Sequence, residues 1–186
     1  MAKIKEGETF PDFEYVTPFT GTKNLKDAVT GTTALVFLRY IGCPLCQYDL
    51  HEYGVNYKEI TDKGGKLLVV LQSDPEYLAT QIQEDSFPYE IICDPTCALY
   101  DRFEIEAPER PKEEQPKSQE PQKLSPKAEK IFAGIKELGY QHGKYEGRET
   151  QLPAFFLLDK DMKVLKADYC TSAIDLPNAL EIAEML

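Results

Sequence analysis

A continuous apolar run leads directly into a close pair of cysteines in Thr33-Ala34-Leu35-Val36-Phe37-Leu38-Arg39-Tyr40-Ile41-Gly42-Cys43-Pro44-Leu45-Cys46. Its first part, residues 33–40, is apolar on both alternating faces, which is typical of a strand covered on both sides of a sheet. Pro44 suits the first turn of a helix, because no hydrogen bond within the helix needs its missing N–H group. We therefore expect a strand over 33–40, a helix over 44–63 and Cys43 at the junction between them.

The segments around this junction repeat the change from strand to helix. Further strands are predicted over 13–17, 66–73 and 89–93, helices over 75–85, 95–103 and 175–186, and a hairpin of strands over 152–158 and 162–169. Strands that alternate with helices favour an α/β sheet with helices on both of its faces. Asp94 is expected to cap the helix over 95–103, because an acidic residue before a proline is a helix-start signal.

The composition describes a soluble protein. The chain has 186 residues, of which 42% are hydrophobic, and 21 basic against 32 acidic side chains give a net charge of −11. Such an acidic balance argues against nucleic acid or an anionic membrane surface as the main partner. No apolar run approaches the roughly 20 residues of a membrane-spanning helix, and no targeting segment is visible. We expect a cytoplasmic protein whose cysteines are kept reduced.

A single domain is expected over residues 1–186, interrupted by one segment of different composition. Residues 104–130 contain five prolines, seven acidic and six basic residues and few apolar ones. Such a segment cannot bury a core and is predicted to be extended or mobile. We interpret it as a solvated surface insertion, with a partner-docking arm as the alternative. An added helix is predicted over 126–138, where apolar side chains recur on one face.

The position of Cys43 and Cys46 at the start of a helix points to thiol chemistry. A helix N-terminus presents free N–H groups and a partial positive charge, and in such places the pKa of a cysteine falls from about 8.5 to about 3.5–7.5. Cys43 is therefore predicted to attack a disulfide, and Cys46 to release the product from the mixed disulfide. Arg39, next to Tyr40, either lowers the pKa of the thiol further or pairs with a surface carboxylate.

Three motifs resemble the AhpC/TSA (peroxiredoxin-like, or redoxin) family of the thioredoxin-like superfamily. They are Gly7-Glu8-Thr9-Phe10-Pro11-Asp12-Phe13, the segment Arg39–Cys46 and the segment Leu152–Asp161. The resemblance implies a thioredoxin-like fold, with a peroxiredoxin-type N-terminal extension and a central mixed sheet. It also implies that Pro153 is a cis-proline that faces the cysteines and shapes a substrate groove together with Arg39 and Tyr40.

The resemblance leaves two mechanisms open. The Pro-x-x-x-Thr/Ser-x-x-Cys loop of peroxiredoxins is absent, whether it is counted back from Cys43 or from Cys46. We therefore favour a thiol–disulfide oxidoreductase that acts in cell redox homeostasis. The alternative is a peroxiredoxin-like thiol peroxidase, an antioxidant protein with Cys43 as the peroxidatic cysteine and Cys46 or the accessory thiol Cys97 resolving it. No organic cofactor is needed in either case. The expected partner is a thiol/disulfide protein or a low-molecular-weight thiol, and for the alternative a peroxide.

A structural zinc site is the competing reading of the cysteines. Cys93 and Cys97 form a second close pair, so that with Cys43 and Cys46 four thiols are present, the number that a structural zinc ion binds. The second pair has three intervening residues and each pair would begin a separate helix, which makes this reading less favoured. For Cys93, Cys97 and Cys170 we expect burial in the core as small apolar residues.

Overall fold

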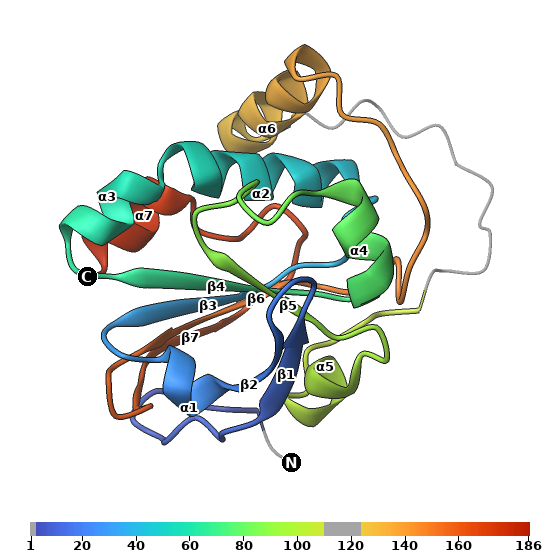
Figure 1. Ribbon diagram of the computed structural model, residues 1–186. Helices are drawn as coiled ribbons and strands as arrows, with labels where there is room; N and C mark the ends of the chain where they lie inside the picture. Colours follow the sequence, from blue (N-terminus) through green and yellow to red (C-terminus); the bar gives the residue numbers. More distant parts are fainter. Residues whose placement is uncertain (1–2, 110–123) are drawn as a thin grey trace.

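Seven strands form one mixed sheet in the computed structural model, which describes residues 3–109 and 124–186. The order across the sheet is β2-β1-β5-β4-β3-β6-β7 (Figure 1). The strands are β1 (Glu14–Thr17), β2 (Gly21–Asn24), β3 (Thr33–Phe37), β4 (Lys66–Leu71), β5 (Glu90–Cys93), β6 (Ala154–Leu158) and β7 (Val164–Tyr169). β3, β4 and β5 are parallel, whereas β1, β6 and β7 each run antiparallel to their neighbours. The expected mixed sheet is confirmed.

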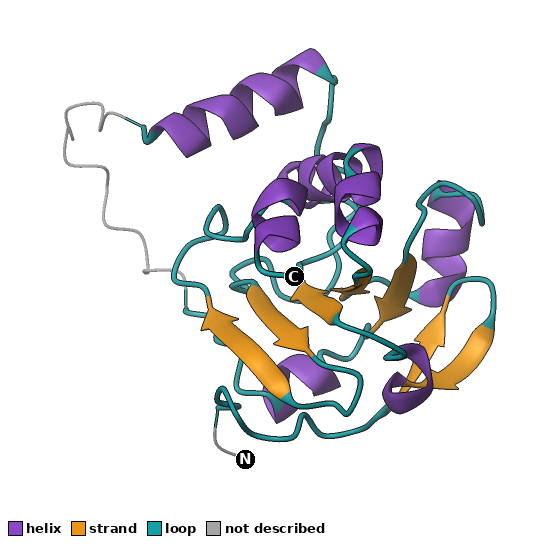
Figure 2. Ribbon diagram, turned by 90° about the vertical axis from the view of Figure 1, so that its left-hand side faces the viewer, coloured by secondary structure: helices purple, strands orange, loops and turns teal. Residues whose placement is uncertain are grey.

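Helices cover both faces of this sheet (Figures 1 and 2). They are α1 (Leu25–Ala28), α2 (Pro44–Val55), α3 (Tyr57–Asp62), α4 (Pro75–Gln81), α5 (Ala98–Arg102), α6 (Pro126–Glu137) and α7 (Ala179–Glu184). One core contains Leu50 of α2, Ile60 of α3 and Ile182 of α7, and the other contains Leu25 of α1 and Leu99 of α5. The sheet therefore separates two hydrophobic cores, as the apolar strands β3, β4 and β6 require.

α6 lies outside α2 as an additional layer (Figure 1). Gly134 of α6 sits so close to α2 that a Cβ atom there would be 2.3 Å from the ring of Tyr48. The N-cap Ser125 accepts a hydrogen bond from the N–H of Ala128. This helix occupies the place where the sequence predicts one, and it packs on the same helix that carries Cys46.

Four predicted helices differ from the structure at their boundaries. The helices predicted over 75–85 and 175–186 are shorter, since α4 ends at Gln81 and α7 spans Ala179–Glu184. The helix predicted over 44–63 is divided at Asn56 into α2 and α3. The helix predicted over 95–103 begins only at Ala98, because Cys97 adopts a left-handed backbone conformation with φ 59°. Asp94 still caps it, since its carboxylate accepts from the N–H groups of Ala98 and Leu99 at 3.0 and 2.8 Å. The short elements β2 and α1 were not predicted.

The insertion is more ordered at both of its ends than its composition predicts. Ile105 is buried, and its carbonyl accepts a hydrogen bond from the side chain of Gln151 at 2.9 Å. At the other end, residues 126–130 belong to α6, the helix that the sequence predicts from residue 126. The expectation of an extended or mobile segment is therefore wrong at Ile105, while residues 110–123 lie outside the described residues.

Pro153 is not a cis-proline. Within residues 3–109 and 124–186 no peptide bond is cis, so this expectation is wrong. The backbone here is extended and held in place on both sides: Leu152 N–H donates to the carbonyl of Glu106 at 2.9 Å, and the carbonyl of Pro153 accepts from Cys170 N–H at 3.1 Å. In the same described ranges, no helix has the length and apolar character needed to cross a membrane.

Candidate active site

Cys43 lies beyond the carboxyl end of β3, at the N-cap of α2. Its backbone is extended (φ −82°, ψ 122°), and Pro44 begins the helix, as the sequence predicts. The loop before it is fixed against the chain that follows β4: Gln72 N–H donates to the carbonyl of Arg39 at 2.6 Å, and Ile41 N–H donates to Ser73 Oγ at 3.0 Å. The end of the parallel sheet therefore holds the cysteine in one position.

The two thiols form an acid–base pair. A hydrogen bond from the Cys46 thiol to Cys43 lowers the pKa of Cys43 to about 6, against the opposing effect of burial. The charge of Arg39 and the N–H groups of Cys46 and Leu45 act in the same direction. Burial, together with this hydrogen bond and the charge of Cys43, raises the pKa of Cys46 well above its ordinary value. At neutral pH Cys43 is therefore the thiolate and Cys46 the proton donor beside it.

Arg39 holds the sulfur of Cys43 directly. Its Nη2 donates to Cys43 Sγ at 3.0 Å, and its Nη1 donates to the backbone carbonyl of Glu149 at 2.6 Å. The first of the two sequence interpretations is thus correct, because the guanidinium contacts the thiol. Tyr40 lies beside it, with its hydroxyl 3.1 Å from His142 Nε2. Burial and the charge of Cys43 raise the pKa of Tyr40 to about 12.

A segment that we name the strap, residues 139–150, connects α6 with the chain before β6 and crosses the site. Gly143 N–H donates to the carbonyl of Gly42 at 2.8 Å. A Cβ atom on Gly42 would lie 2.2 Å from the carbonyl oxygen of Lys144, so only glycine permits this approach. Gln47 also donates to the carbonyl of Gln141 at 3.2 Å. The strap therefore rests directly on the loop that carries Cys43.

Further contacts fix the second half of the strap. Glu146 accepts hydrogen bonds from Ser73 Oγ at 2.9 Å and from Asp74 N–H at 3.2 Å. Arg148 N–H donates to Gln72 Oε1 at 2.5 Å, and its guanidinium forms two bonds to Asp101. Cys43 is only 2% exposed and Cys46 3%, and both pack in the core on this face of the sheet. The thiol with the lowered pKa is therefore nearly sealed from solvent.

The other cysteines do not join this site. Among residues 3–109 and 124–186, no group of three or more His, Cys, Asp or Glu side chains could hold a metal ion. The zinc alternative is therefore wrong. The reason is that Cys93 packs in the same core as Cys43, whereas Cys97 packs in the core on the other side of the sheet, with its thiol 3.1 Å from Gln72 Oε1. The accessory role of Cys97 and the groove role of Pro153 stay predictions.

Several residues that shape the site were not predicted. Ser73, Gln72 and Glu146 lack a local motif, and they reach the site only through the sheet and the strap. The one available signal was the glycine content of residues 139–151, which marked a loop. Arg148 pairs with Asp101 and does not contact Cys43. Arg39 supplies the cation at the sulfur.

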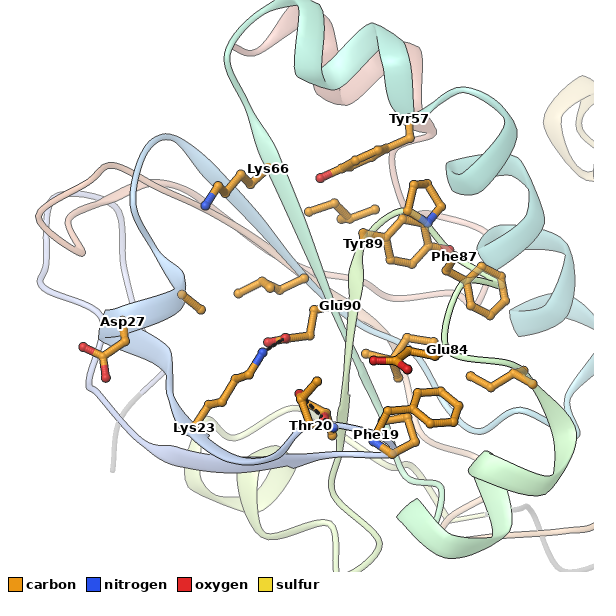
Figure 3. A pocket seen from close by; sticks show the side chains of 18 of the residues that line it. Phe19, Thr20, Lys23, Asp27, Tyr57, Lys66, Glu84, Phe87, Tyr89 and Glu90 are labelled. Carbon is orange, nitrogen blue, oxygen red and sulfur yellow. Dashed lines mark hydrogen bonds and ion pairs between the residues drawn. The ribbon is translucent and has the colours of Figure 1, made fainter.

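A separate cavity of the described chain lies elsewhere. It has a volume of about 830 Å³ and is lined by the β1–β2 hairpin and by the amino ends of β4 and β5, with Phe19, Tyr57, Phe87 and Tyr89 in its walls (Figure 3). Lys23 forms an ion pair with Glu90 across its floor. Cys43 follows the carboxyl end of β3, whereas this cavity lies at the amino ends of the parallel strands β4 and β5. The cavity is therefore not the thiol site.

Known proteins were compared with this chain by sequence and by structure. No curated protein matches the sequence. Similar solved structures include a mutant of PrxQ from Xylella fastidiosa (12% identity, TM-score 0.65, covering 97% of this chain and 94% of that one). Peroxidoxin BcpB from Mycobacterium tuberculosis is also similar (16%, 0.59, 92% and 90%). A third is a putative thiol:disulfide interchange protein DsbE from Chlorobium tepidum (15%, 0.53, 89% and 85%). These likenesses show the thioredoxin-like fold.

The family follows from the sequence match. Residues 7–167 match the AhpC/TSA family, a range that includes the N-terminal motif, both cysteines of the site, the strap, β6 and most of β7. The chain therefore belongs to the AhpC/TSA family and is a thiol-dependent oxidoreductase with a thioredoxin-like fold.

Proposed function

We propose that Cys43 and Cys46 form a redox-active dithiol that exchanges electrons with disulfides. The observation that carries this proposal is the pair of contacts on the Cys43 sulfur, which accepts hydrogen bonds from Arg39 and from the Cys46 thiol. One thiol is ionised and the other protonated at the same time, which is the starting state that a two-step exchange requires.

The exchange begins when the Cys43 thiolate attacks one sulfur of a disulfide R–S–S–R′. A bond forms between Cys43 and R–S, and R′–S⁻ leaves and takes up a proton. The charge of Cys43 is consumed in this step, and that charge is one cause of the raised pKa of Cys46. Cys46 therefore becomes more acidic once the mixed disulfide exists, loses its proton and attacks Cys43 Sγ. The Cys43–Cys46 disulfide forms, R–S⁻ leaves, and the substrate has gained two electrons.

Peroxide reduction is the second candidate, and the burial of Cys43 favours it. A thiol that is 2% exposed is reached more easily by a small hydroperoxide than by a large disulfide. The thiolate would attack the terminal oxygen of R–O–OH to give a sulfenic acid and R–O⁻, which is then protonated. Attack by Cys46 would give the same Cys43–Cys46 disulfide and water.

The dithiol must be reduced again for a second turnover. A protein dithiol is the electron donor that we favour, because the net charge of −11 repels anionic low-molecular-weight thiols. A cytoplasmic location would supply such donors and keep the thiols reduced. Neither a metal nor an organic cofactor enters the proposed steps.

The Cys46→Ser variant tests the proposal. With a small aromatic disulfide it should retain a mixed disulfide on Cys43, whereas the wild type should release both thiols and form an intramolecular disulfide. Mass spectrometry of peptides measures both states. Cys93→Ser is the matched control, since burial raises the pKa of that thiol to about 12, and it should behave as the wild type does. If Cys46→Ser instead accumulates sulfenic acid with peroxide at the wild-type rate and no mixed disulfide, the peroxidase candidate replaces exchange.

A further inference from the structure

The strap has a geometric relation to the dithiol that the exchange steps do not use. Arg39 donates from one guanidinium nitrogen to Cys43 Sγ at 3.0 Å and from the other to the Glu149 carbonyl at 2.6 Å. A single side chain therefore joins the reactive sulfur to the segment that covers it. We propose that the strap selects by size what reaches the Cys43 thiolate, and that Arg39 is a latch which loosens the strap when the dithiol is oxidised.

Selection by size follows from the contacts over the reduced site. The strap is seated by Gly143 on Gly42, by Glu146 on Ser73 and by Arg148 on Gln72. A disulfide in a folded protein brings its surrounding backbone with it, whereas Cys43 is 2% exposed and the strap rests on the neighbouring Gly42. In the reduced state the substrate is therefore a low-molecular-weight disulfide, and a protein disulfide is excluded.

The latch follows from the charge on the sulfur. A hydrogen bond to an ionised acceptor is roughly twice as strong as one between neutral groups. When a small disulfide R–S–S–R oxidises the pair, Cys43 and Cys46 become bonded to each other, R–S⁻ and R–SH leave, and the second product carries the proton of Cys46. The sulfur near Arg39 is then neutral, so the guanidinium loses its stronger anchor. Arg39 still donates to the Glu149 carbonyl, but it no longer ties the strap firmly to the Cys43 sulfur.

The consequence is an order of partners. A small disulfide enters the closed, reduced protein, and a protein dithiol then reduces the oxidised protein, whose strap is loosened. This order rests on the proposed function, since it needs the Cys43–Cys46 disulfide to form. In this order, oxidation takes place with the strap closed and reduction with the strap loosened, although both reactions occur at the Cys43 sulfur.

Two maleimides of different size test the selection on reduced protein. N-ethylmaleimide and a maleimide carried on a polyethylene glycol chain have the same reactive group, and we expect only the large reagent to be slow at Cys43. Glu146→Ala removes two strap contacts and should raise the large-reagent rate at least about tenfold, the factor that about 1.4 kcal/mol provides. The rate with N-ethylmaleimide should change less than threefold. Glu137→Ala, an exposed glutamate on α6, is the matched control.

Two results of this experiment would overturn the selection. One is equal labelling of wild-type Cys43 by both reagents, and the other is an unchanged ratio of the two rates in folded Glu146→Ala. Thermal unfolding verifies that this variant is folded. If Glu146→Ala is unfolded, Arg148→Ala replaces it, since this substitution removes the guanidinium bonds to Asp101. An unchanged ratio of the two labelling rates would again overturn the selection.

Hydrogen exchange tests the latch. The strap amides of Gly143 and Arg148 donate hydrogen bonds in the reduced protein, and they should exchange at least about tenfold faster after oxidation by a small disulfide. Reduced Arg39→Gln should exchange as fast as the oxidised wild type. Mass spectrometry of the same sample counts the Cys43–Cys46 disulfide. If the disulfide forms and exchange is unchanged, the latch is wrong and the proposed function stands. If no disulfide forms, the proposed function fails, and the maleimide experiment still decides the selection.

Discussion

Cys43 and Cys93 both lie toward the carboxyl ends of parallel strands and have opposite chemistry. Cys43 follows β3 and directly precedes α2, whereas Cys93 is the last residue of β5, ahead of α5, and both pack in the same core. Yet the pKa of Cys43 is lowered to about 6, by its hydrogen bond from Cys46 above all, and burial raises that of Cys93 to about 12. Burial near the end of a strand therefore does not make a thiol reactive. What differs is which groups face the sulfur.

The two helix starts contribute to the difference, beside the Cys46 thiol and the charge of Arg39. At the β3–α2 junction, Pro44 begins the helix directly after Cys43, so the first N–H groups face the sulfur. At the β5–α5 junction, the helix starts later, and the carboxylate of Asp94 takes the N–H groups of Ala98 and Leu99. The same helical property stabilises a thiolate at one junction and a carboxylate at the other.

The largest expected effect comes from removing the cation at the first junction. Arg39→Ala should raise the pKa of Cys43 above about 6, because its charge no longer favours the thiolate. Alkylation by iodoacetamide at pH 4–5, below the pKa of Cys43 in both proteins, should slow about tenfold for each pKa unit, since the thiolate fraction there falls by about that factor. Rates measured from pH 4 to 9 locate the pKa in wild type and variant. Lys136→Ala, an exposed cation on α6, is the control; an unchanged midpoint in Arg39→Ala would show that the cation does not set the difference between the junctions.

A smaller effect is expected from Asp49, one helical turn beyond Cys46. Burial, and next the negative charge of Cys43, raise the pKa of this carboxyl well above its ordinary value. Its contribution to stability is fully present below the unfolded pKa near 4 and is lost as the pH rises through the folded pKa. Asp49→Asn should therefore leave the free energy of unfolding unchanged in acid and raise it at neutral pH, by on the order of 1 kcal/mol.

Urea unfolding at pH 4 and pH 8 measures this gain in reduced protein. Asp62→Asn, an exposed aspartate that pairs with Lys58, should show no such increase. The gain from Asp49→Asn should shrink in a Cys43→Ser background, where the neighbouring negative charge is absent. An equal gain in both backgrounds would mean that Asp49 responds to burial alone and not to the thiolate.

The smallest effect belongs to the second junction. Asp94→Ala removes the cap of α5 and should cost about 1 kcal/mol of stability, as seen in thermal unfolding. It should leave the alkylation rate of Cys43 unchanged, because the two junctions have separate helix starts. A change in the reactivity of Cys43 would mean that the junctions are coupled through the sheet.

The two junctions also differ in how well the sequence predicts where the helix begins. The β3–α2 junction is predicted correctly because an apolar run, a proline and the cysteines are all local signals. The α5 start is misplaced because Cys97 adopts a left-handed conformation, which its residue type does not indicate. Zinc ligation by Cys93 and Cys97 is proposed from spacing, and it fails because the left-handed turn sends the two thiols into different cores.

The contacts around Cys43 were predicted only in part. Two interpretations of Arg39 stayed open, because the sequence does not show whether its side chain contacts the Cys43 sulfur or a surface carboxylate. The cover over the site could not be predicted at all, because the contact of Gly143 with Gly42 joins segments that only the folded sheet brings together. The family resemblance even gave one error, a cis-proline at Pro153.

The pattern of pKa values among the five cysteines has a practical consequence for chemical probes. Burial raises the pKa of Cys46, Cys93, Cys97 and Cys170, and only Cys43 ionises near pH 6. A small electrophile applied in mildly acidic buffer should therefore attach to one defined position of the unaltered protein. A small spin label placed in this way needs no cysteine-free background, and it reports from inside the site rather than from the surface.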